Sequence, residues 1–203
     1  MNSNIKELLL GNAAVARGLY EAGISVVSAY PGTPSTEITE AIAKYDEVYS
    51  EWAPNEKVAF EVAFGAALGG ARAFCAMKHV GLNVAADPLY TASYIGTNGG
   101  MVCAVADDPG MHSSQNEQDS RHHAIASKVP MLEPASSQEC KDYAMLAFEL
   151  SEKYDTPVLL RLSTRISHSR SPVTIGNRND VPLKGYKKDP QKHVMMPAMA
   201  RAR

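Results

Sequence analysis

Short apolar runs of strand length alternate along this chain with longer stretches in which apolar residues recur at helical spacing. Six runs are apolar and bounded by glycine, proline or polar residues, which predicts β-strands. They cover residues 24–30, 48–52, 72–77, 101–106, 131–133 and 156–162. The intervening stretches predict helices over residues 12–23, 34–44, 55–70, 81–95, 121–127 and 136–153.

Four residues refine the predicted helices. Asn12 is placed to cap the first helix, and Thr33 is placed to cap the second. Pro34 would then occupy the first helical position, where a missing N–H costs nothing. Pro88 lies near the middle of the helix over residues 81–95 and is expected to kink it.

Strands that alternate with helices of this length predict a parallel sheet covered on both faces, because parallel strands need a crossover connection. We therefore expect an α/β fold of three layers, α/β/α, with a mostly parallel sheet of about six strands. Ligands bind beyond the carboxyl ends of the strands in such sheets. Chemistry is thus expected in the loops that follow Tyr30, Met77 and Ala106.

The chain divides into a patterned part and an unpatterned part. Its 203 residues and 45% hydrophobic content suffice for one sizeable core, which we place in a single domain over residues 1–163. Periodicity disappears after residue 163, so residues 164–203 are expected to form an extended linker or tail. We expect this tail to lead toward a missing second domain of a longer subunit.

Charge is distributed unevenly between these two parts. Residues 1–163 hold 11 Lys and Arg against 20 Asp and Glu, whereas residues 164–203 hold 9 against 2. A basic tail of this kind can bind nucleic acid, but this one has few aromatic residues. The favoured interpretation is a solvated segment, or one that pairs with a partner surface. We therefore expect no nucleic-acid partner.

Several classes of protein are disfavoured by composition. Cys75, Cys103 and Cys140 are widely spaced and form no CxxC pair, which disfavours a disulfide framework or an iron–sulfur or zinc site and suggests buried thiols. No apolar run reaches the roughly 20 residues that span a bilayer, and the start lacks the order of a secretory signal. A cytoplasmic protein without a membrane partner is expected.

The helix over residues 55–70 carries the most informative pattern. Glu56 begins it, and its later turns consist almost entirely of small residues that include Gly65 and Gly69. On spacing alone, the plainer interpretation is that an acidic residue complements the helix dipole and that glycines permit tight packing. A functional interpretation gains weight only from resemblance.

Asn55-Glu56, followed by a small-residue helix that reaches glycine nine positions after the glutamate, resembles the pyrimidine-domain signature of thiamine diphosphate enzymes. The resemblance implies that Glu56 hydrogen-bonds the aminopyrimidine ring of thiamine diphosphate and promotes loss of the thiazolium proton. Glu61 is a weaker rival, because it lies five residues later on a different side of the helix.

Two further loops resemble the 2-oxoacid ferredoxin oxidoreductases of this class. The run Tyr-Pro-Gly-Thr-Pro-Ser over residues 30–35 is similar to a loop whose threonine contacts substrate, which assigns that role to Thr33. Lys78 and His79 match the indolepyruvate group; a lysine here could receive a carboxylate, and a histidine could move a proton. The alternative is a surface Lys-His pair. The resemblance also places Gly32, Gly81 and Asn83 among the cofactor-binding residues.

The polar segment over residues 107–123 also matches the indolepyruvate group. A loop of this length is usually functional or mobile. Its histidines and acidic residues show no HxxxH or HxH pair, so a metal site is disfavoured. The loop is instead expected to cover the cofactor or to meet a partner domain.

The resemblance implies half of an enzyme that oxidatively decarboxylates arylpyruvates such as indolepyruvate. The full enzyme would use magnesium, 4Fe–4S clusters, coenzyme A and ferredoxin, none bound by this domain alone. The implied partners are a diphosphate-binding domain of the same subunit and a beta subunit, with self-association as a dimer. Two alternatives remain: a non-oxidative thiamine diphosphate 2-oxoacid decarboxylase, and a non-catalytic α/β binding domain.

Overall fold

Six strands form one sheet, parallel throughout, in the spatial order β3-β2-β4-β5-β7-β6. The structure is a computed structural model that describes residues 5–202. Residues 1–4, part of the segment inspected for a secretory signal, and Arg203 lie outside the described residues. The strands of this sheet are β2 (Val26–Ala29), β3 (Tyr49–Trp52), β4 (Ala73–Lys78), β5 (Met101–Asp107), β6 (Met131–Leu132) and β7 (Val158–Ser163).

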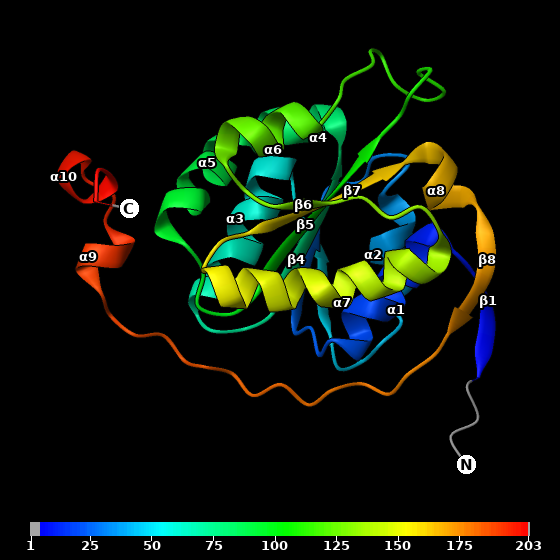
Figure 1. The fold of residues 1–203 in the computed structure, drawn as a ribbon, viewed down its shortest axis with the longest axis horizontal. Coiled ribbons are helices and arrows are strands. Elements are labelled where there is room, and N and C mark those ends of the chain that lie inside the picture. The colour runs from blue at the N-terminus through cyan, green and yellow to red at the C-terminus, as the bar shows by residue number, and fades with distance from the viewer. Residues whose placement is uncertain (1–4, 203) are drawn as a thin grey trace.

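Helices cover both faces of this sheet (Figure 1). One face packs against α1 (Gly11–Glu21), α2 (Thr36–Ile42) and α7 (Ser137–Tyr154). The other packs against α3 (Glu56–Leu68), α4 (His79–Val84), α5 (Ala86–Ile95) and α6 (Arg121–Ser127). This arrangement confirms the expected three-layer α/β/α fold with a six-stranded parallel sheet.

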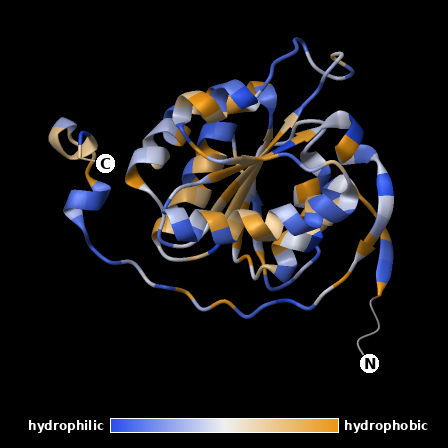
Figure 2. Cartoon of the chain, viewed as in Figure 1, coloured by the Kyte–Doolittle hydropathy of each residue, from blue (hydrophilic) through white to orange (hydrophobic). Residues whose placement is uncertain are grey.

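The central strand β5 shows why both faces must be covered. Val102, Ala104 and Ala106 enter the core beneath α1 and α7, whereas Cys103 and Val105 enter the opposite core. All five are fully buried, as period-two alternation in a strand between two helical layers requires. Figure 2 shows the apolar character of the inner strands.

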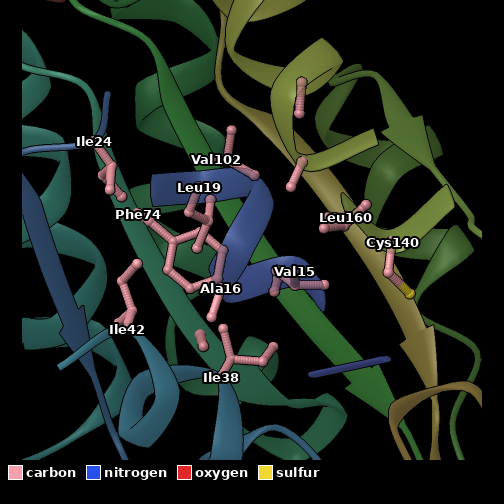
Figure 3. Packing of buried hydrophobic residues seen from close by; sticks show 14 of the residues in the cluster. Val15, Ala16, Leu19, Ile24, Ile38, Ile42, Phe74, Val102, Cys140 and Leu160 are labelled. Atoms are coloured by element: carbon pink, nitrogen blue, oxygen red, sulfur yellow. The ribbon is translucent and has the colours of Figure 1, made fainter. Parts of the chain in front are cut away.

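Large side chains fill the space between α1 and the sheet. Figure 3 shows Leu19 of α1 beside Phe74 of β4 and Val102 of β5, with Ile38 and Ile42 of α2 nearby. Each of these side chains is fully buried, and burying one such side chain contributes about 1.5–3 kcal/mol. The sequence predicts one core, whereas the sheet separates the buried apolar side chains into two clusters, one on each face.

The expected single helix over residues 81–95 is instead two helices, α4 and α5, that meet at Ala85. The break lies within the turn before Pro88, which is where a proline disrupts a helix, so the predicted disruption is present as a full break and not as a kink. Pro88 falls in the first turn of α5, where backbone N–H groups have no partner within the helix.

The cap predicted at Asn12 was also wrong. Helix α1 begins one residue earlier, at Gly11, and Asn12 is fully buried inside its first turn. The Asn12 amide donates to the carbonyl of Pro34 at 2.7 Å, so a tertiary contact takes the side chain away from its own helix.

The segment after β7 is more ordered than its composition indicates. Three short helices occur there: α8 (Thr164–His168), α9 (Pro190–His193) and α10 (Pro197–Ala200). Between the first two, β8 (Arg170–Thr174) pairs antiparallel with β1 (Lys6–Leu10), and Lys6 lies opposite Thr174. The sequence pattern predicted neither β1 nor β8. Each of these two strands finds its pairing partner at the other end of the chain.

Residues 175–189 contain no helix or strand and run along the molecule toward α9 (Figure 1). Arg178 donates to the carbonyls of Tyr20 and Ile24, and Lys184 pairs with Glu152 at 3.4 Å. The basic tail therefore lies against the acidic body of the same chain.

Two expectations concern membranes and thiols. Among the residues described, no helix combines the length and apolar character needed to cross a membrane. All three cysteines are free and buried, which confirms that interpretation. Burial raises the pKa of the Cys140 thiol to about 12.

Two helical glycines provide a matched test of this packing. A side chain at Gly18 of α1 would overlap the Lys141 carbonyl of α7, whereas nothing lies within 4 Å of a side chain added at Gly65 of α3. We expect Gly18→Ala to lower the free energy of unfolding by about 1–3 kcal/mol through overpacking. Gly65→Ala should raise it by about 0.5–1 kcal/mol, because alanine favours a helix. Denaturant unfolding of both variants checks this pair. Unchanged stability in Gly18→Ala would contradict the packing of α1 on α7, and destabilisation by Gly65→Ala would contradict the open surface of α3.

Candidate functional site

The strand order places a topological switch point between β2 and β4. The chain leaves β2 toward β3 on one side and leaves β4 toward β5 on the other, so the loops after these two strands diverge. Such a switch point is where α/β sheets bind ligands. The loops after β2, β3, β4, β5 and β7 all meet at this carboxyl edge, as expected.

Glu56 enters this edge from the first turn of α3. Asn55 caps the helix, with its side-chain oxygen accepting from the Val58 N–H at 3.0 Å, and this fixes where the Glu56 backbone lies. The Glu56 carboxyl group packs against Gly81 of α4: a side chain on Gly81 would come within 2.6 Å of Glu56 Oε1. Within the described residues the carboxyl group has no hydrogen bond or ion pair. It is therefore available to a ligand.

The rival carboxylate is placed differently. Half of the Glu61 side chain is exposed, and it lies 3.9 Å from Lys57 on the outer surface of α3. The helical offset of five residues turns it away from Gly81. Geometry thus favours Glu56 over Glu61 for contact with a ligand at the strand ends.

The loop after β2 departs from the expected capping. Helix α2 begins at Thr36, with Ser35 before it, rather than at Pro34. The Gly32 carbonyl accepts from both the N–H and the hydroxyl of Ser35, which closes a tight turn containing a cis Thr33–Pro34 peptide bond. Thr33 therefore does not cap α2, and that prediction was wrong. Its side chain is exposed at the carboxyl edge.

Gly32 and Lys78 lie together at this switch point. A side chain on Gly32 would meet the Lys78 side chain at 3.3 Å. The Lys78 ammonium donates to the carbonyl of Ser113 at 3.1 Å. Lys78 therefore contacts both the loop after β2 and the loop after β5.

His79 contacts the same loop. It is fully buried, and its Nε2 lies 3.1 Å from the Asn116 carbonyl oxygen. A carbonyl oxygen only accepts hydrogen bonds, so Nε2 carries the proton. Nδ1 is also buried and has no partner in the described part of the chain. His79 is therefore not a surface residue of a Lys-His pair, which was the plainer alternative.

Asn83 faces away from Glu56. It is exposed on α4, and its side-chain oxygen lies 3.1 Å from Nε2 of His123 on α6. Burial, the larger effect, lowers the pKa of His123 despite the opposing charge of Asp107. The structure brings Glu56 and Gly81 together, and Gly32 and Lys78 together, but does not bring Asn83 to either pair.

Two aspartates at the end of β5 fix the polar loop over residues 107–120, a role that sequence reasoning missed. Asp107 accepts from Arg161 Nε at 2.8 Å and from the N–H and hydroxyl of Ser120. Asp108 accepts from the Ser113 N–H at 2.8 Å and from the Thr164 hydroxyl at 2.7 Å. The sequence contains one signal of this role, namely two aspartates at the end of an otherwise apolar strand.

Hydrogen bonding dominates the electrostatics of Asp108. Burial alone would raise its pKa, but the donors from Ser113, Thr164 and Ser114 outweigh burial and hold the pKa well below its ordinary value. The loop is therefore held at its base by an ionised carboxylate. Its far end projects from the body of the molecule (Figure 1).

A cavity of about 410 Å³ lies beside this loop, lined by Pro109, His112, Ser163, Thr164 and Arg165. A larger one of about 570 Å³ lies near the amino-terminal ends of β6 and β7, lined in part by Tyr90, Tyr94 and Tyr154. In the described part of the chain, no group of three or more histidine, cysteine and acidic side chains could hold a metal ion.

A model of the family described as "Pyruvate flavodoxin/ferredoxin oxidoreductase, thiamine diP-bdg" matches residues 17–202. The chain belongs to this family. Two curated relatives, each named "Indolepyruvate oxidoreductase subunit IorA", are 52% identical to it. The one from Archaeoglobus fulgidus aligns over 209 residues, 97% of this chain and 33% of its own length. The one from Pyrococcus horikoshii aligns over 205 residues, which is 97% of this chain and 32% of its own length.

A solved structure has the same fold at lower identity. It is the 2-oxoglutarate:ferredoxin oxidoreductase from Magnetococcus marinus, 22% identical, with a TM-score of 0.76 over 92% of this chain and 34% of that chain. The present chain thus spans about a third of the length of the curated relatives it matches.

The family binds thiamine diphosphate, and the residues present fit one half of that cofactor. A pyrimidine ring nitrogen needs a carboxyl group with which it can share one proton, and the unpartnered carboxyl group of Glu56 can do this. Gly81 has no side chain, which leaves room for the Glu56 carboxyl group itself. For the magnesium and diphosphate half, the described residues offer no cluster of acidic ligands.

The Asp108 anchor gives a pH-dependent prediction. Asp108→Asn should lower the free energy of unfolding by roughly 1–2 kcal/mol at pH 7, because charge-assisted hydrogen bonds are lost. The pKa of Asp108 is lower in the folded protein than its unfolded value of about 3.9, so the ionised carboxylate stabilises the fold fully at pH values above about 3.9. This stabilisation is lost progressively as the pH falls below that value. The difference between the two proteins should therefore narrow at pH 3. Thermal melts at pH 7 and pH 3 measure it, and a gap independent of pH would show that the carboxylate charge is unimportant.

Proposed function

We propose that this chain is the pyrimidine-binding domain of an enzyme that oxidatively decarboxylates arylpyruvates, indolepyruvate among them. The observation that carries the proposal is the Glu56 carboxyl group, free of protein partners and packed against the bare backbone of Gly81 at the carboxyl edge. The names of the relatives at 52% identity support the arylpyruvate substrate.

When bound, thiamine diphosphate supplies the carbon nucleophile that attacks the keto group of a 2-oxoacid. Glu56 accepts or shares a proton at the cofactor's aminopyrimidine ring, and its position at the first turn of α3 holds that contact fixed. Gly81 leaves the space that the Glu56 carboxyl group occupies, since a side chain at residue 81 would collide with that group.

Three groups of this chain act toward the substrate in the proposal. The exposed Thr33 hydroxyl donates to a substrate oxygen, and the Lys78 ammonium receives the carboxylate in exchange for its contact with Ser113. His79 moves a proton through Nδ1, the ring nitrogen that has no partner among the described residues.

The complete reaction needs parts outside this chain. We propose that a diphosphate-binding domain of the same subunit supplies the magnesium and diphosphate ligands, and that a beta subunit completes the enzyme. Coenzyme A would accept the acyl group, and 4Fe–4S clusters would pass electrons to ferredoxin. Self-association as a dimer is proposed from the open face of α3 around Gly65.

Glu56→Gln tests the proposed role directly. Glutamine keeps the size but cannot share a proton, so turnover of the assembled enzyme should fall by roughly 10²–10⁴-fold. Stability should change little, by about 0.3–1 kcal/mol, from the loss of one first-turn charge. Indolepyruvate-dependent ferredoxin reduction and deuterium exchange at the thiazolium carbon are the measurements. Glu61→Gln is the matched control, and a collapse of activity only in that control would overturn the assignment.

The isolated chain should bind thiamine diphosphate weakly or not at all. Its described residues offer an acceptor for the pyrimidine ring but no acidic cluster for the magnesium that accompanies the diphosphate. Titration calorimetry with magnesium and thiamine diphosphate on the 203-residue chain is the test. Micromolar affinity would mean that a diphosphate site is present in this chain.

A further inference from the structure

Two loops with the proposed substrate-facing groups come from different strands and do not adjoin in sequence. One, residues 30–35, follows β2 and carries Thr33; the other, residues 107–120, follows β5 and contacts Lys78 and His79. Strands β2 and β5 are separated by β4 in the sheet. Lys78 of β4 already lies against Gly32 in the first loop and donates to Ser113 in the second. A further connection, outside the sheet, also reaches both loops.

The connection between β7 and β8, residues 164–169, reaches both loops. It contains the single-turn helix α8 and lies in the segment whose composition indicated only a linker. At its first residue, the Thr164 hydroxyl donates to Asp108 Oδ1 at 2.7 Å and lies 3.4 Å from the Asp107 carbonyl oxygen. This end is therefore bound to the base of the 107–120 loop.

The other end of the connection reaches the first loop through Glu37. His168 Nε2 lies 3.4 Å from Glu37 Oε1, in the first turn of α2. Glu37 Oε2 accepts from the Asn12 amide at 2.9 Å, and the same amide donates to the Pro34 carbonyl at 2.7 Å. His168, Glu37 and Asn12 thus form a chain of contacts that ends on the turn carrying Thr33.

The middle of the connection is held against α1 at backbone distance. The Gly11 N–H donates to the Ser169 carbonyl at 3.1 Å, and a side chain on Gly11 would overlap the Ile166 carbonyl. Only glycine permits this approach. The connection is therefore packed tightly against α1 between the contacts of Thr164 and His168.

We propose that the β7–β8 connection couples the two loops, with Thr164 and His168 as positioning residues. Loosening either end changes the position of both loops, although neither residue contacts the Glu56 carboxylate. The inference deepens the proposed function, because it takes the two loops as parts of one reaction site; the coupling itself does not depend on which reaction occurs.

Amide hydrogen exchange on the 203-residue chain tests the coupling without any assay of activity. Thr164→Val keeps the shape of the side chain and removes the hydroxyl. Losing a hydrogen bond to a carboxylate corresponds to roughly ten- to hundredfold in a local opening equilibrium, so exchange within residues 109–116 should accelerate by that order. The coupling also predicts faster amide exchange within residues 32–37, in the other loop.

Two further variants and one control complete the test. Thr164→Ser restores the donor and should return both loops to the exchange rates of the parent chain. His168→Ala acts at the other end and should accelerate both loops as well, which keeps the test decisive if Thr164→Val fails to fold. Arg170→Ala, an exposed residue just beyond the connection, should leave both loops unchanged.

Kinetics of the assembled enzyme provide the readout for positioning. Thr164→Val should raise KM for the 2-oxoacid about tenfold and change kcat by less, with rescue by Thr164→Ser. Acceleration confined to the loop nearest the substitution, or uniform acceleration across the whole chain, would overturn the coupling. Coupled exchange in an enzyme that does not turn over indolepyruvate would instead reject the proposed function and leave the coupling intact.

Discussion

Every strand of the main sheet runs in the same direction, so each must be followed by a return across one face before the next begins. That constraint buries both faces of the sheet and makes the inner strands almost wholly apolar. It also brings all six carboxyl ends to one edge. Glu56, Thr33, Lys78 and Asp108 come from four separate regions of the sequence, yet they gather there because the chain direction leaves no other place for loops of this kind.

Missing side chains shape this edge as much as the polar groups do. Gly81 gives room to the Glu56 carboxyl group, and Gly32 gives room to the Lys78 side chain. Gly11 likewise gives room to the backbone of the β7–β8 connection where it packs against α1. At Gly11 the neighbour is a backbone carbonyl that a methyl group would overlap, so glycine is required there. At Gly81 a methyl group would displace the Glu56 carboxyl group, whereas at Gly32 the flexible Lys78 side chain would have to shift only slightly.

Charged groups fix the loop after β5 and the basic tail to the rest of the protein. Asp107 and Asp108 end β5 inside the protein, and such carboxylates persist only with donors around them, which Arg161 and Thr164 provide. The result is a loop fixed at its base by charge-assisted hydrogen bonds. At the opposite edge, the basic tail meets acidic groups of the body, as where Lys192 lies 2.7 Å from Asp155.

The sequence by itself determined the layered α/β fold and the place of Glu56, because apolar periodicity and helix capping are local properties. Most predicted strands fall within a few residues of those observed. Tertiary structure decided what depends on distant partners: the pairing of β1 with β8, the contact between Glu56 and Gly81, and the link from Thr164 to Asp108. The same difference explains the errors at Asn12 and Thr33. Capping patterns indicate what a side chain can do for its own helix, whereas the burial of Asn12 against the turn at Pro34 arises only when segments 22 residues apart meet.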